Sequence, residues 1–531
     1  MKVRFLVLVL ILGLYKIDAQ ETQQPKLIVG IVVDQMRYDY LTKFYNDFGE
    51  DGFKRLLREG LNCKNVHYTY KPTYTGPGHA TIFTGTSPSV HGIVGNNWFE
   101  RSEKESVYCV KLNDGDSSSF SPKRLLVETF ADALKQHSNF NSKSFGISLK
   151  DRGAILPAGH LADGAYWFSS EKGVWQSDAY YLNNNPVWLQ EFNAQDYSKR
   201  YLSEGWTLSQ SISEYSESAP DLNSYEFPLT KNSKTTFPYD LVKAQKESDW
   251  GILKKVPQGN QMSADLFKLL IEKELIGKDD YTDFVSLSFS ATDYVGHIFG
   301  VQSVEVHDTY IKLDKTIADI LQFLDNNVGK EKYTLFLTSD HGAGMPRAYL
   351  KEKGIPSGKL DGREISKNLK RIAVQEGVSE DWIARVMNLN VYFNDSLKAT
   401  EEEKYQRLKL KCSQWLNKQK GIARVVDLEN ISDSEDKREK MVLEGVHPKR
   451  SGDLVLVEEA NWSSYTDKGS THGSPYEYDT HVPLLFYGFG IPKGEVLSAH
   501  PVRSIVPSLS LLFGFQTNGV VQTEPIQELF E

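Results

Sequence analysis

Carboxylate and imidazole side chains recur in this sequence beside short apolar runs. Asp293 and His297 stand four residues apart in DYVGH, and Asp340 and His341 are adjacent in SDHG. Positions i and i+4 of a helix face the same way. Asp293 and His297 could therefore converge on one point, as the oxygen and nitrogen ligands of a zinc ion do. Taken alone, the pair is better explained by a capping aspartate and a hydrogen-bonded histidine.

Three further residues are unremarkable singly and informative together. Asp34 ends the run KLIVGIVVD, His472 precedes a turn in THGSP, and Thr75 stands on a stiff turn in TYTGPGHAT. Gly and Pro mark turns in any protein, so a surface loop is the simplest interpretation of that last stretch. However, three strand-end aspartates, three histidines and a threonine form a donor set for two metal ions. Without metal binding, each of these seven residues would need a separate structural explanation.

These side chains need elements that bring them together. Four apolar runs of strand length lie at 26–35, 283–297, 333–342 and 481–488. Between them, apolar residues at helical spacing fall at 53–60, 124–136, 262–275 and 314–327. Runs apolar on both faces are typical of a parallel sheet covered by helices. The order predicts an α/β fold with a mostly parallel sheet, whose ligands gather at the carboxyl ends of the strands.

Two regions interrupt this alternation. Residues 155–260 are rich in Tyr, Ser, Asn and Trp, whereas residues 346–450 are charged and partly helical in pattern. We expect one catalytic domain over residues 26–525, with insertions at about 155–260 and 346–450. The first insertion could cover the site. The central domain is expected to resume near GDLVLVEEANW, at 452–462.

The N-terminus has the pattern of an export signal. Lys2 and Arg4 precede an apolar run from Phe5 to Tyr15, and Ala19 offers a small residue for cleavage. The run is shorter than the ~20 residues of a membrane span. We expect residues 1–19 to be removed, which leaves a periplasmic or secreted monomer without a span. Cleavage removes three cations and one anion and takes the net charge from −9 to −11, which disfavours binding to nucleic acid or anionic membranes.

The cysteines constrain the site only weakly. Cys63, Cys109 and Cys412 include no Cys-x-x-Cys pair, which argues against a cysteine-based zinc site. Cys63 and Cys109 could pair in an oxidising compartment, leaving Cys412 free, but the spacing leaves the pairing open.

Several stretches, taken in order, resemble the alkaline phosphatase superfamily. They are IVVDQMR, PTYTGPGHATIFTG, HGIVGNNW, SLKDRG, TDYVGH, TSDHG and THGSPYEYDTHVPLLFYG, which run from residue 31 to about 488. No single stretch is specific, whereas the ordered set is. The sequence is most similar to the phosphate-irrepressible, broad-specificity periplasmic alkaline phosphatases with a threonine nucleophile. We therefore expect an alkaline phosphatase-like core with inserted lobes.

The resemblance implies two Zn²⁺ ions. The implied ligands are Asp293, His297 and His472 for one ion, and Asp34, Asp340, His341 and the Thr75 oxygen for the other. His481 is an alternative to His472, which is favoured because the family's late metal histidine lies in a His-Gly turn. Thr75 would be the nucleophile, since zinc favours its alkoxide, and would form a covalent phosphothreonine. His79 is expected to be structural, because it lies within the helix that follows Thr75.

The resemblance also implies the substrate class. Lys150 and Arg152 of SLKDRG, and Asn96 of HGIVGNNW, match residues that bind phosphate in the monoesterases, with Asn97 a close alternative to Asn96. A monoester dianion carries one more negative charge than a diester, so added cations favour it. The expected function is hydrolysis of small phosphate monoesters of broad scope, which releases inorganic phosphate. From the residues alone, Lys150 and Arg152 would be read as a solvated strand end.

Other functions fit these residues less well. A phosphodiesterase or nucleotide pyrophosphatase of the same superfamily would share the metal ligands and the threonine. A sulfatase needs a formylglycine motif, which no cysteine here provides, and the related mutases use serine, usually with manganese, and are cytoplasmic. A secreted binding protein that had lost chemistry would be expected to lose a ligand, and all seven are present.

Overall fold

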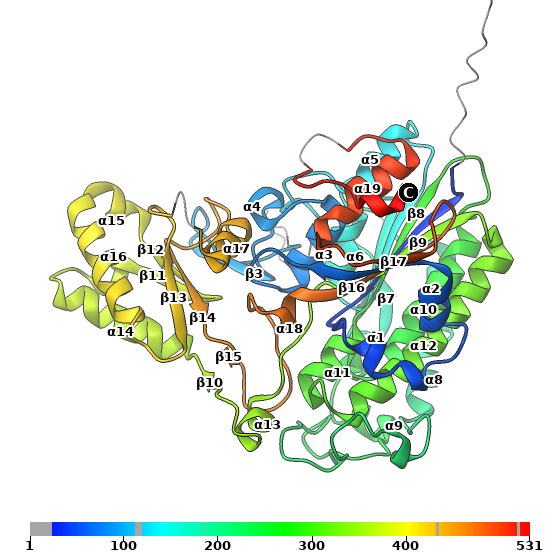
Figure 1. Ribbon diagram of the computed structural model, residues 1–531, viewed down its shortest axis with the longest axis horizontal. Helices are drawn as coiled ribbons and strands as arrows, with labels where there is room; N and C mark the ends of the chain where they lie inside the picture. The colour runs from blue at the N-terminus through cyan, green and yellow to red at the C-terminus, as the bar shows by residue number, and fades with distance from the viewer. Residues whose placement is uncertain (1–23, 112–118, 183, 432–434, 518–520) are drawn as a thin grey trace, which may run out of the picture.

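A ten-stranded sheet forms the centre of the computed structural model, which describes residues 24–531 apart from 112–118, 183, 432–434 and 518–520. The strand order is β17-β2-β16-β9-β1-β8-β5-β6-β7, and β18 also pairs with β2. Figure 1 shows helices on both sides of this sheet. The strands are β1 (Leu27–Val33), β2 (Leu61–His67), β5 (Ser144–Ser148), β6 (Gly164–Ser169), β7 (Val174–Gln176), β8 (Asp283–Phe289), β9 (Tyr333–Thr338), β16 (His481–Gly488), β17 (Gly494–Val496) and β18 (His500–Pro501). The expected signal peptide, residues 1–19, lies outside the described residues.

The middle of the sheet is parallel, which confirms the predicted α/β fold. β1 pairs in parallel with β8 and β9, and β5 pairs in parallel with β6 and β8. Every residue of β1, β8 and β9 is buried, as expected for strands covered on both faces. The run at 481–488 is an exception, because β16 lies antiparallel to both β9 and β2. The sheet is therefore mixed, with its parallel strands at the site.

Helices cover both faces of this sheet, and the alternating side chains of β1 serve both layers. Leu27, Val29 and Ile31 join a cluster with helices α2 (Phe53–Glu59), α10 (Gln258–Lys273) and α12 (Val304–Leu324). Ile28 and Val32 join another cluster, with α3 (Thr75–Thr84), α5 (Phe130–His137) and α19 (Ile505–Phe513). The central strands are thus packed against helices on both faces.

Most of the predicted helices form, with shifted ends. The patterns at 53–60 and 262–275 correspond to α2 and α10, and the pattern at 314–327 lies mainly in α12. The pattern at 124–136 becomes helical only from Phe130. There the Thr129 hydroxyl accepts a hydrogen bond from the Asp132 backbone N–H, and the Asp132 carboxylate accepts one from the Thr129 N–H. This capping box fixes the start of α5.

A separate lobe carries a second, antiparallel sheet, drawn in yellow and orange in Figure 1. Its order is β11 (Ile383–Met387), β12 (Asn390–Phe393), β14 (Leu454–Glu458) and β13 (Ile422–Asp427), with helices α14 (Gly362–Gln375) and α16 (Glu402–Leu416). We expected the central domain to resume near GDLVLVEEANW. That run instead forms β14, because Leu454 and Leu456 fill the core of the lobe with Leu369 and Leu408.

The first expected insertion starts inside the central sheet. Residues 164–176 form β6 and β7, and the chain leaves the sheet only afterwards, through α7 (Val187–Ala194), α8 (Tyr197–Ser203) and α9 (Leu241–Lys246). This segment reaches the neighbourhood of His297. There the Phe227 N–H donates to the Ile298 carbonyl, and the Gly469 N–H donates to the Tyr225 carbonyl.

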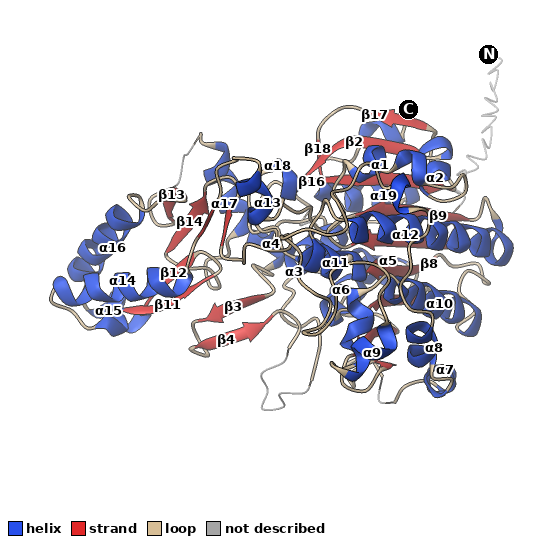
Figure 2. Ribbon diagram, turned by 90° about the horizontal axis from the view of Figure 1, so that it is seen from below, coloured by secondary structure: helices blue, strands red, loops and turns tan. Residues whose placement is uncertain are grey.

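A short hairpin, β3 (Asn97–Glu100) and β4 (Glu105–Tyr108), lies between the lobe and the central domain (Figure 2). The three cysteines are buried and unbonded, so the disulfide that the sequence left open is not formed. Cys63 belongs to the cluster around β2, whereas Cys109 belongs to a different cluster beyond β4. Among the described residues, no helix is both long and apolar enough to cross a membrane.

Candidate active site

The predicted site residues meet at the carboxyl ends of three adjacent parallel strands. Asp34 follows β1, Asp293 lies in the first turn of helix α11 (Ala291–Phe299) after β8, and Asp340 and His341 follow β9. The register of β1 pairs it directly with both β8 and β9, so the three strand ends are neighbours. His472 enters from the loop before α18 (Glu477–Thr480). The structure thus joins residues separated by more than four hundred positions in the sequence.

Two groups of donor atoms form within this cluster. Carboxylate and imidazole atoms of Asp34, Asp340 and His341 all lie within 4.8 Å of one another, as do those of Asp293, His341 and His472. His297 adjoins the second group, with Nε2 at 3.1 Å from the Asp293 Oδ1. The His341 and His472 rings are stacked with their centroids 3.4 Å apart. His341 therefore lies where the two groups meet.

The second ring nitrogen of each of these histidines is already occupied. The pairs are His297 Nδ1 with the Ser470 carbonyl at 2.7 Å, His341 Nδ1 with the Gly342 carbonyl at 3.0 Å, and His472 Nδ1 with the Thr73 carbonyl at 2.7 Å. A carbonyl oxygen only accepts hydrogen bonds, so each Nδ1 must donate. In the neutral ring, the Nε2 lone pair then faces the carboxylates, which is the second-shell arrangement of metal-binding histidines.

Two carboxylate oxygens in the cluster lack a hydrogen-bond partner. Asp34 Oδ1 and Asp340 Oδ2 are buried and accept no hydrogen bond, which is costly for an acceptor-only group. The nitrogens beside them are His341 Nε2, at 3.6 Å from Asp34 Oδ1, and His79 Nδ1, which lies 3.3 Å from Asp340 Oδ2 but already bonds to the Thr75 carbonyl. Burial raises the pKa of Asp34 well above its ordinary value, and the charge of Asp340 adds to this shift against the opposing effect of Lys150. A divalent cation would supply what both oxygens lack. These residues therefore fit a metal ion bound by oxygen and nitrogen, as zinc is.

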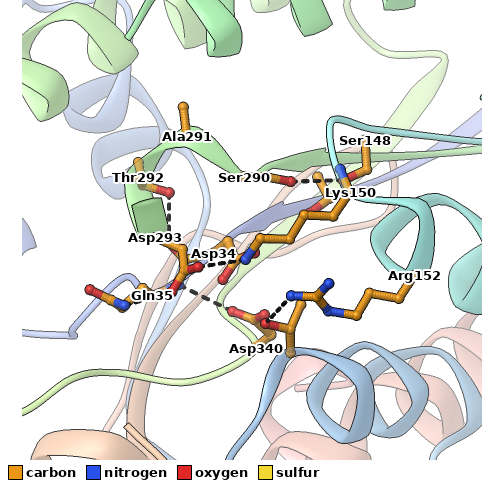
Figure 3. Close-up of polar contacts among 12 residues, drawn as sticks. Asp34, Gln35, Ser148, Lys150, Arg152, Ser290, Ala291, Thr292, Asp293 and Asp340 are labelled. Atoms are coloured by element: carbon orange, nitrogen blue, oxygen red, sulfur yellow. Dashed lines mark hydrogen bonds and ion pairs between the residues drawn. The ribbon is translucent and has the colours of Figure 1, made fainter. Parts of the chain in front are cut away.

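Lys150 links the two donor groups. Its Nζ lies 2.6 Å from Asp34 Oδ2 and 2.6 Å from Asp293 Oδ2 (Figure 3). Burial lowers the pKa of Lys150, but Asp293 and Asp34 outweigh it and raise the pKa above its ordinary value. The sequence alone suggested a solvated strand end. The structure instead ends β5 at Ser148 and places Lys150 as the N-cap residue of α6 (Asp151–Ala158), with its ammonium buried among carboxylates.

The charges of Asp293 and His297 stabilise each other. Burial raises the pKa of Asp293, but His297 and Lys150 outweigh burial and hold it well below its ordinary value. Burial likewise lowers the pKa of His297, and Asp293 reverses that shift. For His472, burial and the neighbouring His341 both lower the pKa, so its ring stays neutral. A neutral imidazole beside an ionised carboxylate is what a metal ion requires of its ligands.

Thr75 is the first residue of α3, and the glycines beside it serve close approach. Its Oγ1 lies 3.4 Å from His341 Nε2. A Cβ on Gly78 would stand 2.3 Å from the Asp340 carbonyl oxygen, and one on Gly76 would stand 3.1 Å from Asn96 Oδ1. Only glycine lets the helix start this near to the ligands of the site. This is the structural reason for the sequence TGPG.

Arg152 and Asn96 adjoin Thr75 from another side. Arg152, in the first turn of α6, places Nη2 at 3.4 Å from Thr75 Oγ1. Asn96 Oδ1 accepts a hydrogen bond of 2.7 Å from the Gly76 backbone N–H. Asn97, the rival to Asn96, begins β3, and its backbone carbonyl accepts from Asn388 Nδ2. The structure thus brings Asn96 next to the start of α3.

Two histidines considered from the sequence lie outside the donor groups. His79 Nδ1 is 2.9 Å from the Thr75 carbonyl and its Nε2 is 2.9 Å from Ser288 Oγ, so both ring nitrogens are occupied. His481 Nε2 bonds to the Lys64 carbonyl at 2.9 Å, and its ring stacks on Tyr38. The structure brings together His472, and not His481, with Asp293.

Sequence reasoning missed two contributors to the site. Gln35 Nε2 donates to Asp293 Oδ1 at 2.6 Å, and its backbone N–H donates to Asp340 Oδ1. Its φ of 67° is in the left-handed region. Its place directly after Asp34, a predicted metal ligand at a strand end, was a usable signal in the sequence. Tyr108, whose hydroxyl contacts Arg152 at 3.0 Å, lies 44 positions before it and gave no such signal.

Comparisons with known proteins agree with this geometry. A family model described as Type I phosphodiesterase / nucleotide pyrophosphatase matches residues 28–482. The chain is 39% identical to "Calcium-transporting ATPase" of Myroides odoratus over 97% of this chain and 96% of that protein. It is 37% identical to alkaline phosphatase PhoV of Synechococcus elongatus (94% and 91%), and 36% identical to alkaline phosphatase PafA of Elizabethkingia meningoseptica (97% and 96%). The crystal structure of wild-type alkaline phosphatase PafA superposes with a TM-score of 0.91 at 37% identity, covering 95% of this chain and 99% of that one.

Proposed function

The chain belongs to the type I phosphodiesterase / nucleotide pyrophosphatase family, and we propose that it hydrolyses small phosphate monoesters at a two-zinc site. Within the alkaline phosphatase superfamily it is a phosphatase. The proposed reaction is broad in scope, proceeds through a covalent phosphothreonine at Thr75 and releases inorganic phosphate. The observation that carries the preference for monoesters is the Arg152 guanidinium, with Nη2 at 3.4 Å from Thr75 Oγ1.

The proposed zinc ligands are the two donor groups with their neighbours. Asp34, Asp340, His341 and the Thr75 oxygen would hold one ion, and Asp293, His297 and His472 would hold the other. The unpaired Asp34 and Asp340 oxygens and the Nδ1 bonds of the three histidines support this assignment. When bound, the ions would act as Lewis acids that stabilise negative charge on the Thr75 oxygen and on the departing ester oxygen.

The protein's own groups would bind and orient the phosphate. Thr75 Oγ1 forms the new bond to phosphorus as the ester oxygen leaves, and water then cleaves the phosphothreonine and restores Thr75. Because Asn96 Oδ1 is occupied by the Gly76 N–H, its amide NH₂ is the group that remains for a phosphate oxygen. The Arg152 fork suits two oxygens of a dianion. Lys150 adds a buried positive charge within the same cluster.

The alternative function is that of a phosphodiesterase or nucleotide pyrophosphatase, which the description of the matching family names. Such an enzyme would use the same ligands and the same threonine. The deciding experiment compares kcat/KM for an aryl phosphate monoester and the matched diester, using zinc-loaded protein. We expect a ratio that strongly favours the monoester. A ratio that favours the diester would retain Thr75 and the metal site but overturn the assigned substrate class.

We also propose that residues 1–19 direct export and are then removed. The mature protein would be a monomer in the periplasm or outside the cell, with no nucleic-acid partner. The charged start and apolar run described above support this, and the net charge of −9 agrees with the absence of a polyanionic partner. N-terminal sequencing of the exported protein should begin at Gln20. A start at Met1 would contradict the cleavage.

A further inference from the structure

The hydroxyl of a partly buried tyrosine, Tyr108, joins two residues that are neighbours in SLKDRG. Tyr108 OH is 2.5 Å from Asp151 Oδ1 and 3.0 Å from Arg152 Nη1. We propose that Tyr108 is a positioning residue, which with Asp151 fixes the Arg152 guanidinium for recognition of a phosphate dianion. The inference rests on the proposed function, because it concerns how that function discriminates between monoesters and diesters.

The direction of each hydrogen bond follows from chemistry. An ionised Asp151 only accepts, so the single proton of Tyr108 points to Asp151 Oδ1. The tyrosine oxygen is then left as an acceptor for Arg152 Nη1. Asp151 Oδ1 also accepts from the Arg152 backbone N–H at 2.6 Å. Asp151, Tyr108 and Arg152 therefore close a ring of hydrogen bonds in which the guanidinium has one favoured orientation.

The guanidinium has little else to hold it. Among the described residues, its hydrogen-bond partners are Tyr108 and Thr75, while the buried Nε has none. An arginine side chain has substantial rotamer freedom that must be lost on binding phosphate. If Tyr108 removes that freedom beforehand, the ligand does not have to supply the ordering energy. Because a neutral hydroxyl holds Arg152 here, its positive charge remains available to the substrate.

The same hairpin also holds Asn96. Tyr108 is the last residue of β4 and pairs with Asn97, the first residue of β3. Just beyond it, the Cys109 N–H donates to the Asn96 carbonyl at 2.9 Å. The base of this hairpin thus supports both Asn96 and Arg152, which are the residues proposed to contact the non-bridging oxygens. Its conformation sets the spacing between them.

The test is Tyr108→Phe in the zinc-loaded enzyme, assayed on an aryl phosphate monoester and its matched diester. We expect kcat/KM for the monoester to fall about tenfold, the effect of losing one hydrogen bond to a charged group, while the diester changes by less than about twofold. The matched control is Tyr181→Phe. Tyr181 OH donates to the Gly159 carbonyl at 3.0 Å, at the opposite end of α6, and its loss should leave both activities near wild type.

A double-mutant cycle with Arg152→Ala separates positioning from general damage. If Tyr108 acts through Arg152, Tyr108→Phe should change monoester hydrolysis less than about twofold in the Arg152→Ala background. A loss of the same size in both backgrounds, equal losses on monoester and diester, or no loss at all would overturn the inference. The Arg152→Ala variant also tests the proposed function separately. If that variant alone spares monoester hydrolysis, the assigned phosphate contact is wrong, whatever Tyr108 does.

Discussion

At the scale of single residues, the site depends on side chains that have two polar atoms. One atom hydrogen-bonds to the protein backbone, and the other faces the site. The three histidines use Nδ1 on backbone carbonyls, and Asn96 uses Oδ1 on Gly76. The aspartates were predictable from the sequence because each follows a buried strand. The position of the Lys150 ammonium was not, because its partners lie at residues 34 and 293 and no local pattern encodes that meeting.

Replacing Thr75 tests the nucleophile. Thr75→Ala should lower kcat for monoester hydrolysis at least about a thousandfold, because the variant lacks the proposed attacking oxygen. Mass spectrometry after rapid acid quenching should detect phosphorylated wild type and no phosphorylated variant. The control is Thr84→Ala at the other end of α3, where the hydroxyl bonds only locally, to the Ala80 carbonyl and Thr86. Unimpaired turnover by the Thr75 variant would refute the assignment.

Replacing Lys150 and Arg152 together tests the cationic contacts. Loss of both charges should reduce kcat/KM for a monoester about a hundredfold or more, and reduce it less for the matched diester, which carries one negative charge fewer. The measurement is the ratio of variant to wild-type kcat/KM, determined once for the monoester and once for the diester at saturating zinc. Metal content is determined for each preparation. Equal losses on both substrates would contradict a role in recognising the dianion.

Removing the metal tests the ligand set as a whole. Dialysis against a chelator should abolish activity and lower the melting temperature by several degrees, because bound metal stabilises the folded state and unpaired buried carboxylate oxygens remain without it. Added Zn²⁺ should restore both properties. A protein that keeps full activity after its metal content has fallen to background would exclude a metal-dependent reaction.

At the scale of elements, periodicity predicted which segments form strands and helices but not which sheet a strand joins. The run at 26–35 lies in the parallel centre, whereas that at 481–488 is antiparallel and β14 belongs to the lobe. Alternating or continuous apolar residues show that a strand is buried. They do not show against which partner it is buried, since register and direction depend on contacts far along the chain.

Helix α12 begins with a buried carboxyl group that should make stability depend on pH. Burial raises the pKa of Glu305 to about 8, although its bond from Tyr239 OH opposes this shift. Burial and the charge of Glu305 together raise the pKa of Glu226 to about 9. Between the ordinary glutamate pKa and these raised values, Glu305 and Glu226 keep their protons in the folded state and lose them in the unfolded chain. Stability should fall as the pH rises from about 4.5 towards 9.

The variant Glu305→Gln checks this dependence. It keeps an acceptor for Tyr239 and cannot ionise, so it should melt a few degrees higher than wild type at pH 9 and close to wild type at pH 5. Thermal unfolding of zinc-loaded protein at both pH values gives the comparison. The same difference between variant and wild type at both values would show that ionisation is not the cause.

At the scale of the whole molecule, the lobe supports the site through the β3–β4 hairpin. Arg101, beyond β3, donates to Asp453 at 2.9 Å and to the carbonyl of Phe393 at 3.1 Å, both in the lobe. Phe99 packs edge-on against Tyr392 with ring centroids 5.3 Å apart. The lobe therefore holds the outer end of the same hairpin whose base holds Asn96 and Tyr108 (Figure 2).

Breaking this support should affect the reaction from a distance. Arg101→Ala removes a partly buried ion pair with Asp453, and we expect kcat/KM for monoesters to fall about three- to tenfold, because the hairpin is less firmly placed. Lys411→Ala, at an exposed position of α16 in the same lobe, serves as a surface control. Monoester kinetics and melting temperature are measured together. A lower melting temperature with unchanged kinetics would show that Arg101 contributes to stability and not to the reaction.

The order of the ligands along the chain limits when the enzyme can act. The donor groups require Asp34 from the first strand and His472 from the loop before α18. During synthesis or passage through a membrane, residue 472 emerges late. Until it has emerged, the group of Asp293, His341 and His472 is incomplete, even if the earlier strands have folded. With the proposed ligand set, catalysis should start only when the polypeptide is almost complete, and truncated products that end before residue 472 should be inert towards phosphate esters.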